Sequence, residues 1–209
     1  MLNRLAEQMQ AFRPRRVRWV MPEAAVLIPV TESDDPSIIL TRRADHMKTH
    51  SGQVAFPGGK RDAEDIDLQS TALREAQEEI GLNPDQVRLL NPLSDVVSLH
   101  GIKVTPFVGL VPAELQLQPC EAELDAIFHV PVSWLLQDPR SHTDVIRVAD
   151  TTYYVPSFPF GEYTIWGLSA MMLVELLQVG FNMDVDLHHK PAGKLIEHPV
   201  RLFPPDAFK

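Results

Sequence analysis

The sequence has too little cysteine for a disulfide-stabilised fold and no apolar run long enough for a membrane span. Cys120 is the only cysteine among 209 residues, so it cannot form an internal disulfide, which fits a reducing compartment. The longest apolar stretch, residues 165–181, contains Glu175 and Gln178 and stays below the roughly 18 residues that a span requires. The N-terminus lacks the apolar core of a signal peptide. We therefore expect a cytoplasmic protein that does not bind membranes.

An excess of positive charge is also missing, because the net charge is −9 and the pI about 5.3. This balance argues against general binding of nucleic acid, although a bound metal ion would still allow an anionic ligand. The arginines of residues 13–18 are interpreted as a solvated basic turn. With 44% hydrophobic and 22% charged residues, we expect one domain over residues 1–209. Its recognisable core spans about residues 23–180, and the N-terminal helix and C-terminal tail are peripheral.

An acidic helix stands out in residues 52–82. Glu75, Glu78 and Glu79 precede Gly81, which suits the end of a helix. Residues three and four apart share a helix face, so the three carboxylates project the same way and repel each other unless a cation lies between them. Oxygen ligands of this kind suit Mg²⁺ or Mn²⁺. The alternative is a solvated acidic face, which lacks lysines to compensate the repulsion.

A glycine pair lies upstream of this helix. A short strand at residues 53–56 leads into Gly58 and Gly59, where we expect a turn that lets the backbone approach a ligand. A strand, a glycine turn and an acidic helix together indicate a metal–phosphate site.

The remaining elements follow from apolar periodicity and from turn residues. The pattern predicts a helix capped by Asp67 or Ser70 and ending near Ile80. The tail from residue 182 is expected to drape over the surface or to be poorly ordered. The other predicted elements are an amphipathic helix at 2–12, strands at 23–31, 38–42, 87–98, 103–111 and 124–130, a short helix at 132–137, a hairpin at 145–148 and 153–155, and a long buried helix at 165–180.

The acidic helix resembles the second half of the Nudix box, in which Arg-Glu, an aliphatic residue and Glu-Glu precede a glycine. The matching run is Arg74-Glu75-Ala76-Gln77-Glu78-Glu79-Ile80-Gly81-Leu82. Two departures are visible. Ala76 replaces a bulkier aliphatic residue, and one extra residue separates Gly59 from Arg74, so that the upstream acid falls on Asp65 or Glu64.

The upstream stretch resembles one branch of this family, the coenzyme A pyrophosphatases. Their extended pattern is matched in three places: Leu40-Thr41-Arg42-Arg43, His50-Ser51-Gly52-Gln53 and Phe56-Pro57-Gly58-Gly59-Lys60-Arg61-Asp62. The resemblance implies an α/β fold, a Nudix α/β/α sandwich with a mixed β-sheet between the two long helices. It also implies hydrolysis of the pyrophosphate of coenzyme A or acyl-CoA with Mg²⁺ or Mn²⁺, giving 3′,5′-ADP and (acyl-)4′-phosphopantetheine.

The resemblance assigns roles to individual residues. It implies Glu75 and Glu79 as first metal ligands, with Glu78 and the carbonyl of Gly59 beside them. Glu78 and Glu79 are the catalytic candidates, and Arg74 supports them by pairing with the upstream acid. The candidate substrate contacts are Arg42, Arg43, His50, Gln53, Lys60 and Arg61. The general base is left open among Glu78, Glu121, Glu123, Glu162 and His100.

Two other functions are compatible with the same sequence. One is a Nudix pyrophosphatase for another nucleoside diphosphate derivative, such as ADP-ribose, NADH or a nucleotide sugar. The other is a non-catalytic Nudix domain that senses a ligand. The expected partner is a small nucleotide of the coenzyme A type, with no nucleic acid and no membrane, and a homodimer is left open. We assign no role to Cys120 or to the pair His188 and His189.

Overall fold

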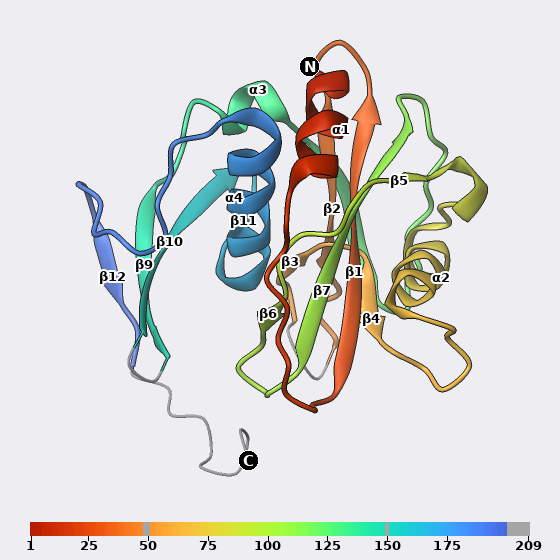
Figure 1. Ribbon diagram of the computed structural model, residues 1–209, viewed down its shortest axis with the longest axis horizontal. Helices are drawn as coiled ribbons and strands as arrows, with labels where there is room; N and C mark the ends of the chain where they lie inside the picture. The colour runs from red at the N-terminus through yellow and green to blue at the C-terminus, as the bar shows by residue number, and fades with distance from the viewer. Residues whose placement is uncertain (48–50, 149–150, 200–209) are drawn as a thin grey trace.

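A mixed eight-stranded sheet forms the centre of the computed structural model, which describes residues 1–47, 51–148 and 151–199 (Figure 1). Its two longest strands, β1 and β7, run parallel side by side, and the main path of the sheet is β3-β2-β1-β7-β5. Strand β4 pairs with β1, β6 with β7 and β8 with β2. The strands are β1 (Glu23–Glu32), β2 (Ser37–Arg43), β3 (Val54–Ala55), β4 (Gly58–Lys60), β5 (Arg88–Leu89), β6 (Val96–Val97), β7 (Lys103–Pro112) and β8 (Leu124–Pro131).

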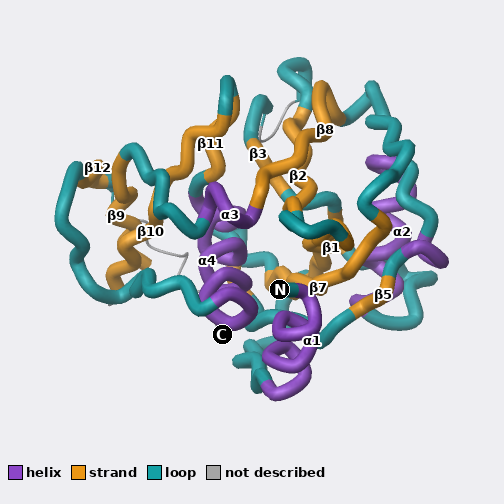
Figure 2. Tube along the Cα trace, turned by 90° about the horizontal axis from the view of Figure 1, so that it is seen from above, coloured by secondary structure: helices purple, strands orange, loops and turns teal. Residues whose placement is uncertain are grey.

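Helices cover both faces of this sheet. Helix α2 (Leu68–Ile80) lies on one face, and α4 (Gly167–Phe181) with α1 (Leu2–Ala11) lies on the other (Figure 2). Because successive strand residues point to opposite faces, Leu27 of β1 joins the core under α2 and Ile28 joins the core under α4. The predicted α/β/α sandwich with a mixed sheet is therefore confirmed.

The acidic helix begins and ends where the sequence predicts. Of the two candidate caps, Asp67 is the N-cap residue, and its carboxylate accepts a hydrogen bond of 2.7 Å from the backbone N of Ser70. Gly81 ends the helix in the left-handed conformation with φ 68°. The long helix α4 begins two residues later than predicted because Ile165 belongs to a strand, and Asn182 ends it in the left-handed region.

The long strand predicted at residues 87–98 is wrong. The segment runs beside β7, but only β5 and β6, of two residues each, form strands. Asn91 and Pro92 separate them, and proline has no backbone N–H to donate to a ladder. The short turn of 3₁₀ helix Pro84–Gln86 and the helix α3 (Val132–Leu135) complete the connections around the sheet.

A second, four-stranded sheet lies beside α4 and has the order β11-β10-β9-β12 (Figure 1). The predicted hairpin is present but longer. Its second strand was predicted to end at residue 155, whereas β10 continues through Pro156 and Pro159. Part of the tail forms β12 and pairs in parallel with β9, so the description of the tail as draped or poorly ordered is wrong there. The strands are β9 (His142–Val148), β10 (Thr151–Phe160), β11 (Tyr163–Ile165) and β12 (Leu195–Glu197).

In the described part of the chain, every helix is too short or too polar to cross a bilayer.

Candidate active site

Glu79 is a buried carboxylate on the face of α2 that turns toward β4. Its Oε2 accepts a hydrogen bond of 3.0 Å from the backbone N of Gly58, and its Oε1 lies 3.6 Å from Nη1 of Arg43. Only 6% of its side chain is exposed. Burial outweighs these two contacts and raises the pKa of Glu79 to about 7. The carboxylate is thus short of compensating positive charge.

Glu75 lies one turn earlier and touches the backbone of β4. The predicted glycine turn is in fact this strand, in which Gly59 pairs with Ala25 of β1. A Cβ atom placed on Gly59 would lie 2.4 Å from the carboxylate of Glu75, so only glycine allows this approach. Burial also raises the pKa of Glu75. The Gly59 peptide and two desolvated carboxylates therefore form one compact group.

Arg74 of α2 binds the loop that precedes the helix. Its Nε and Nη2 donate to the two oxygens of Asp65, both at 2.9 Å, so Asp65 and not Glu64 is its acid partner. Thr71 and the backbone N of Asp62 donate to the same carboxylate, each at 2.9 Å. The hydrogen bonds from Arg74, ahead of the others, hold the pKa of Asp65 well below its usual range. The loop thus accommodates the extra residue between Gly59 and Arg74, and Arg74 still forms a bidentate ion pair with Asp65.

Glu78 is the most exposed of the three glutamates of the acidic helix. Its carboxylate lies 3.1 Å from Nη1 of Arg74, which also contacts Glu75 at 3.1 Å, and 60% of its side chain is exposed. Within the described ranges, no set of three His, Cys, Asp or Glu side chains is gathered closely enough to hold a metal ion. The roles of Glu75, Glu78 and Glu79 as metal ligands therefore stay predictions.

The residues that do come together fit a hard divalent cation. Carboxylate and carbonyl oxygens are the ligands that Mg²⁺ and Mn²⁺ prefer, and Glu75, Glu79 and the Gly59 carbonyl supply them within one small region. A cation there would compensate the two charges that burial now penalises. Glu75 and Glu79 remain the first candidate ligands, and Glu78 remains a further candidate on the same helix.

The two neighbouring arginines of β2 serve different regions. Arg42 pairs with Asp45 and Asp125, both at 2.5 Å. Arg43 instead faces the carboxylate of Glu79. Successive residues of a strand point to opposite faces, which explains why the two adjacent cations separate. Both arginines were predicted to be substrate contacts, and the contact of Arg43 with Glu79 was not predicted, although the alternation of side chains along the strand was the available signal.

A loop that follows β7 brings one further acid to the site. The backbone N of Cys120 donates to the carbonyl of Glu79 at 2.8 Å, and the backbone N of Ala44 donates to the carbonyl of Glu123 at 2.8 Å. These bonds tie the loop to α2 and to the end of β2. The carboxylate of Glu123 lies 3.7 Å from Nη2 of Arg43. Among the candidate bases in the described loops, Glu123 is therefore the one whose ion-pair partner, Arg43, also contacts the box residue Glu79.

The other candidate bases have different surroundings. Glu121 is exposed in the same loop. Glu162 lies in the turn between β10 and β11. Burial is the largest cause of the raised pKa of Tyr163, and the charge of Glu162 is the second. His100 lies in the turn that leads into β7, and its backbone N contacts Oγ of Ser98.

The remaining candidate substrate contacts are distributed around β3 and β4. Lys60 has an exposed side chain, and its carbonyl accepts from Arg74. Gln53 accepts a backbone hydrogen bond from Arg43 just before β3. His50 lies outside the described residues.

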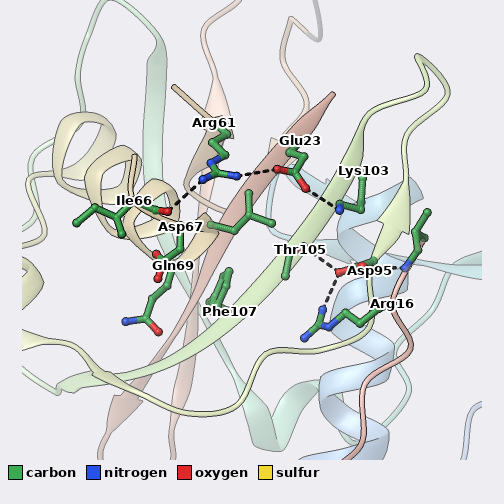
Figure 3. A pocket seen from close by; sticks show the side chains of 12 residues that line it. Arg16, Glu23, Arg61, Ile66, Asp67, Gln69, Asp95, Lys103, Thr105 and Phe107 are labelled. Atoms are coloured by element: carbon green, nitrogen blue, oxygen red, sulfur yellow. Dashed lines mark hydrogen bonds and ion pairs between the residues drawn. The ribbon is translucent and has the colours of Figure 1, made fainter. Parts of the chain in front are cut away.

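Arg61 lines a separate cavity of about 460 Å³ beside the start of α2. Figure 3 shows its guanidinium directed at Glu23, which also binds Lys103 from the other side. Phe107 forms part of the cavity wall, and neither Glu75 nor Glu79 lines it. Arg61 is therefore directed away from the metal-ligand candidates.

The fold and this site define an α/β/α sandwich with two desolvated carboxylates on one helix, whose oxygen atoms are ligands that suit a divalent cation. Comparison with known proteins gives the family. Residues 21–149 match the family model described as NUDIX domain. An uncharacterized Nudix hydrolase NudL from Salmonella newport (strain SL254) is 40% identical over 183 residues, covering 86% of this chain and 95% of that protein. Its counterpart in Enterobacter sp. (strain 638) is 39% identical, with the same coverage. This chain belongs to the Nudix family and is a Nudix hydrolase.

Solved structures of the family show only moderate overall similarity to the chain. The crystal structure of a NUDIX hydrolase from Alicyclobacillus acidocaldarius has a TM-score of 0.48 and 23% sequence identity, and covers 58% of this chain and 83% of its own. Nudix hydrolases generally use divalent metals such as Mg²⁺ or Mn²⁺, in keeping with the chemistry of the carboxylates on α2.

Proposed function

We propose that this protein hydrolyses the pyrophosphate of coenzyme A or an acyl-CoA, with Mg²⁺ or Mn²⁺ as cofactor. The products would be 3′,5′-ADP and 4′-phosphopantetheine or its acyl form. Cleavage of a pyrophosphate requires neutralisation of charge and an activated water more than it requires a covalent intermediate. A divalent cation bound at Glu75 and Glu79 would supply both.

The observation that carries this proposal is the convergence of the extended motif on the box carboxylates. Arg43, from the first motif segment, contacts Glu79, and Gly58, from the third, donates to the same side chain. Gly59 of the third segment packs against Glu75. Two of the segments that resemble the coenzyme A branch thus contact the carboxylates of α2, which supports the proposal. The relatives called NudL are uncharacterized and add no substrate information.

Each site residue has a distinct proposed task. Glu75, Glu79 and the Gly59 carbonyl hold the cation, and Glu78 is an additional ligand or base from the exposed side of α2. Glu123 is the loop acid best placed to accept a proton from the attacking water. Arg74 orients the helix through Asp65. Arg42, His50, Gln53, Lys60 and Arg61 remain candidates for contacts with the substrate phosphates.

A substrate comparison tests the proposal. Purified protein is supplied with coenzyme A, acetyl-CoA, ADP-ribose and NADH, each with Mg²⁺ and with Mn²⁺, and the products are identified by chromatography. We expect kcat/KM for coenzyme A or acetyl-CoA to exceed that for ADP-ribose and NADH by at least about tenfold, equivalent to about 1.4 kcal/mol. Equal or better hydrolysis of ADP-ribose would favour the broader alternative of another nucleoside diphosphate substrate.

The non-catalytic alternative makes a separate prediction. A ligand-sensing domain would bind one of these nucleotides without consuming it in the presence of either metal. Turnover of any of the four compounds contradicts that alternative.

A further inference from the structure

Arg43 joins two acids that belong to different parts of the chain. Its Nη1 lies 3.6 Å from Glu79 of α2, and its Nη2 lies 3.7 Å from Glu123 of the loop after β7. The side chain is only 21% exposed. A guanidinium presents several donors in a rigid plane, so one arginine can hold two carboxylates in a fixed relation.

The backbone fixes Arg43 itself. Its N–H donates to the carbonyl of Gln53 at 2.9 Å, and its carbonyl accepts from the N–H of Gly52 at 3.1 Å. The next residue, Ala44, binds the carbonyl of Glu123. The end of β2 therefore holds the Glu123 segment by its main chain, while Arg43 faces the Glu123 carboxylate.

The charges of the neighbouring carboxylates explain why a guanidinium is needed beside Glu123. Glu123 acts on both Glu75 and Glu79 as a nearby like charge. Without a cation on its own side, the Glu123 carboxylate would be repelled from the two buried carboxylates and would turn toward solvent. Of its side chain, 47% is already exposed to solvent.

We propose that Arg43 is a positioning residue that holds Glu123 beside the carboxylates of α2, rather than a contact for the substrate phosphates. Only the expected effect on kcat rests on the proposed hydrolysis. The geometric part concerns the chain alone. The geometry predicts that the backbone amides of residues 113–123 lose protection from hydrogen exchange when the guanidinium of Arg43 is removed.

The test combines Arg43→Gln, Glu123→Gln and the double variant with Arg88→Gln as the matched control. Arg88 forms an exposed ion pair with Glu32 at 2.9 Å and takes no part in the site. We expect Arg43→Gln to lower kcat about 10- to 100-fold with KM changed less than about threefold. The double variant should lose no more than about threefold beyond Glu123→Gln, because both changes remove one shared function. Arg43→Lys should recover part of the loss.

Two further readouts do not depend on turnover. Binding of Mn²⁺ alone, followed by electron paramagnetic resonance, should be as tight as in the wild type or tighter, because a positive charge beside Glu79 is removed. Hydrogen–deuterium exchange of residues 113–123 should accelerate in Arg43→Gln and not in Arg88→Gln. A rise in KM with kcat unchanged, multiplicative losses in the double variant, unchanged exchange or tenfold weaker Mn²⁺ binding would each overturn the proposal.

The two proposals can fail separately. Absence of coenzyme A hydrolysis by the wild type refutes the proposed substrate, while the exchange and Mn²⁺ measurements still judge Arg43. If another nucleotide is hydrolysed, the same kinetic cycle is run with that nucleotide.

Discussion

Two buried carboxylates each face an arginine: Asp65 lies just before α2, and Glu79 lies within it. Their pKa values are shifted in opposite directions. Asp65 receives two hydrogen bonds from Arg74 and two more from Thr71 and Asp62, and its pKa is held well below its usual range. Glu79 receives one hydrogen bond from Gly58, and burial raises its pKa to about 7. Burial decides the direction of the pKa shift at Glu79, whereas the hydrogen bonds from Arg74 outweigh burial at Asp65, so the presence of an arginine alone does not decide the outcome.

The difference assigns the two carboxylates to different tasks. The group around Asp65 is complete, so it stabilises the junction between the loop and α2 without any ligand. The group around Glu79 is incomplete, which supports the proposal that it is part of a cation site rather than a structural ion pair. Removing each carboxylate should therefore produce opposite patterns of lost activity and lost stability.

Glu79→Gln should have the largest effect on activity. We expect turnover to fall at least about a hundredfold, equivalent to about 2.7 kcal/mol, because a neutral amide binds Mg²⁺ or Mn²⁺ poorly. The amide can still accept from Gly58, and a poorly compensated buried charge disappears. The free energy of unfolding of chelator-treated protein should therefore stay unchanged or rise. Full turnover in this variant would contradict the assignment of Glu79 as a metal ligand.

Asp65→Asn should show the reverse pattern. Losing the charge that Arg74 binds should lower the free energy of unfolding by about 2–3 kcal/mol, measured by urea denaturation. Residual activity should follow the folded fraction, since Asp65 does not touch the metal-ligand candidates. Arg88→Gln, at an exposed pair, provides the control and should change stability by less than about 0.5 kcal/mol. A stable but inactive Asp65→Asn would move Asp65 into the catalytic group.

Gly59→Ala tests the close contact between β4 and α2. A methyl group would overlap the carboxylate of Glu75, so that side chain must move. We expect Mn²⁺ affinity to fall about tenfold, or about 1.4 kcal/mol, with a smaller change in stability. As a matched control, Gly101→Ala introduces a Cβ that meets no atom within 4 Å, although its φ of 71° adds backbone strain. Wild-type Mn²⁺ affinity in Gly59→Ala would show that Glu75 is not held in place by this contact.

The features of α2 were predictable because they depend on local chemistry. The N-cap at Asp67, the left-handed Gly81 and the two helix faces follow from side-chain type and from a period of 3.6 residues. The sandwich was implied by the family resemblance. The pairing of Arg74 could be narrowed to Asp65 or Glu64, and the structure selects Asp65.

The features that sequence could not give are those set by pairing between distant segments. The conversion of the glycine turn into β4 depends on a ladder with β1, and the second sheet depends on the pairing of β12 with β9. The ion pair between Arg43 and Glu123 joins residues 80 positions apart, and no local pattern specifies it. The sequence therefore left Glu123 as one of several loop candidates, and its ion pair with Arg43 is what distinguishes it in the proposal.

The pH dependence of stability gives the finest distinction between the two carboxylates. Asp65 has a folded-state pKa well below the unfolded value of about 4, so its contribution to stability is complete above pH 4. As the pH falls further, the unfolded chain takes up the proton first, and the contribution declines by up to about 1.4 kcal/mol per pH unit until the folded pKa is reached. Asparagine does not titrate. The stability difference between wild type and Asp65→Asn should therefore be constant from pH 7 to 5 and should shrink between pH 4 and 2.5.

This difference is best measured by urea denaturation of both proteins at matched ionic strength. Glu79 has its pKa shifted in the opposite direction and is present in both proteins, so its own pH dependence cancels in the comparison. A difference that persists unchanged down to pH 2.5 would mean that the Asp65 charge contributes nothing. The effect of the substitution would then come from the altered shape of the loop, and the contrast with Glu79 would be one of packing rather than of charge.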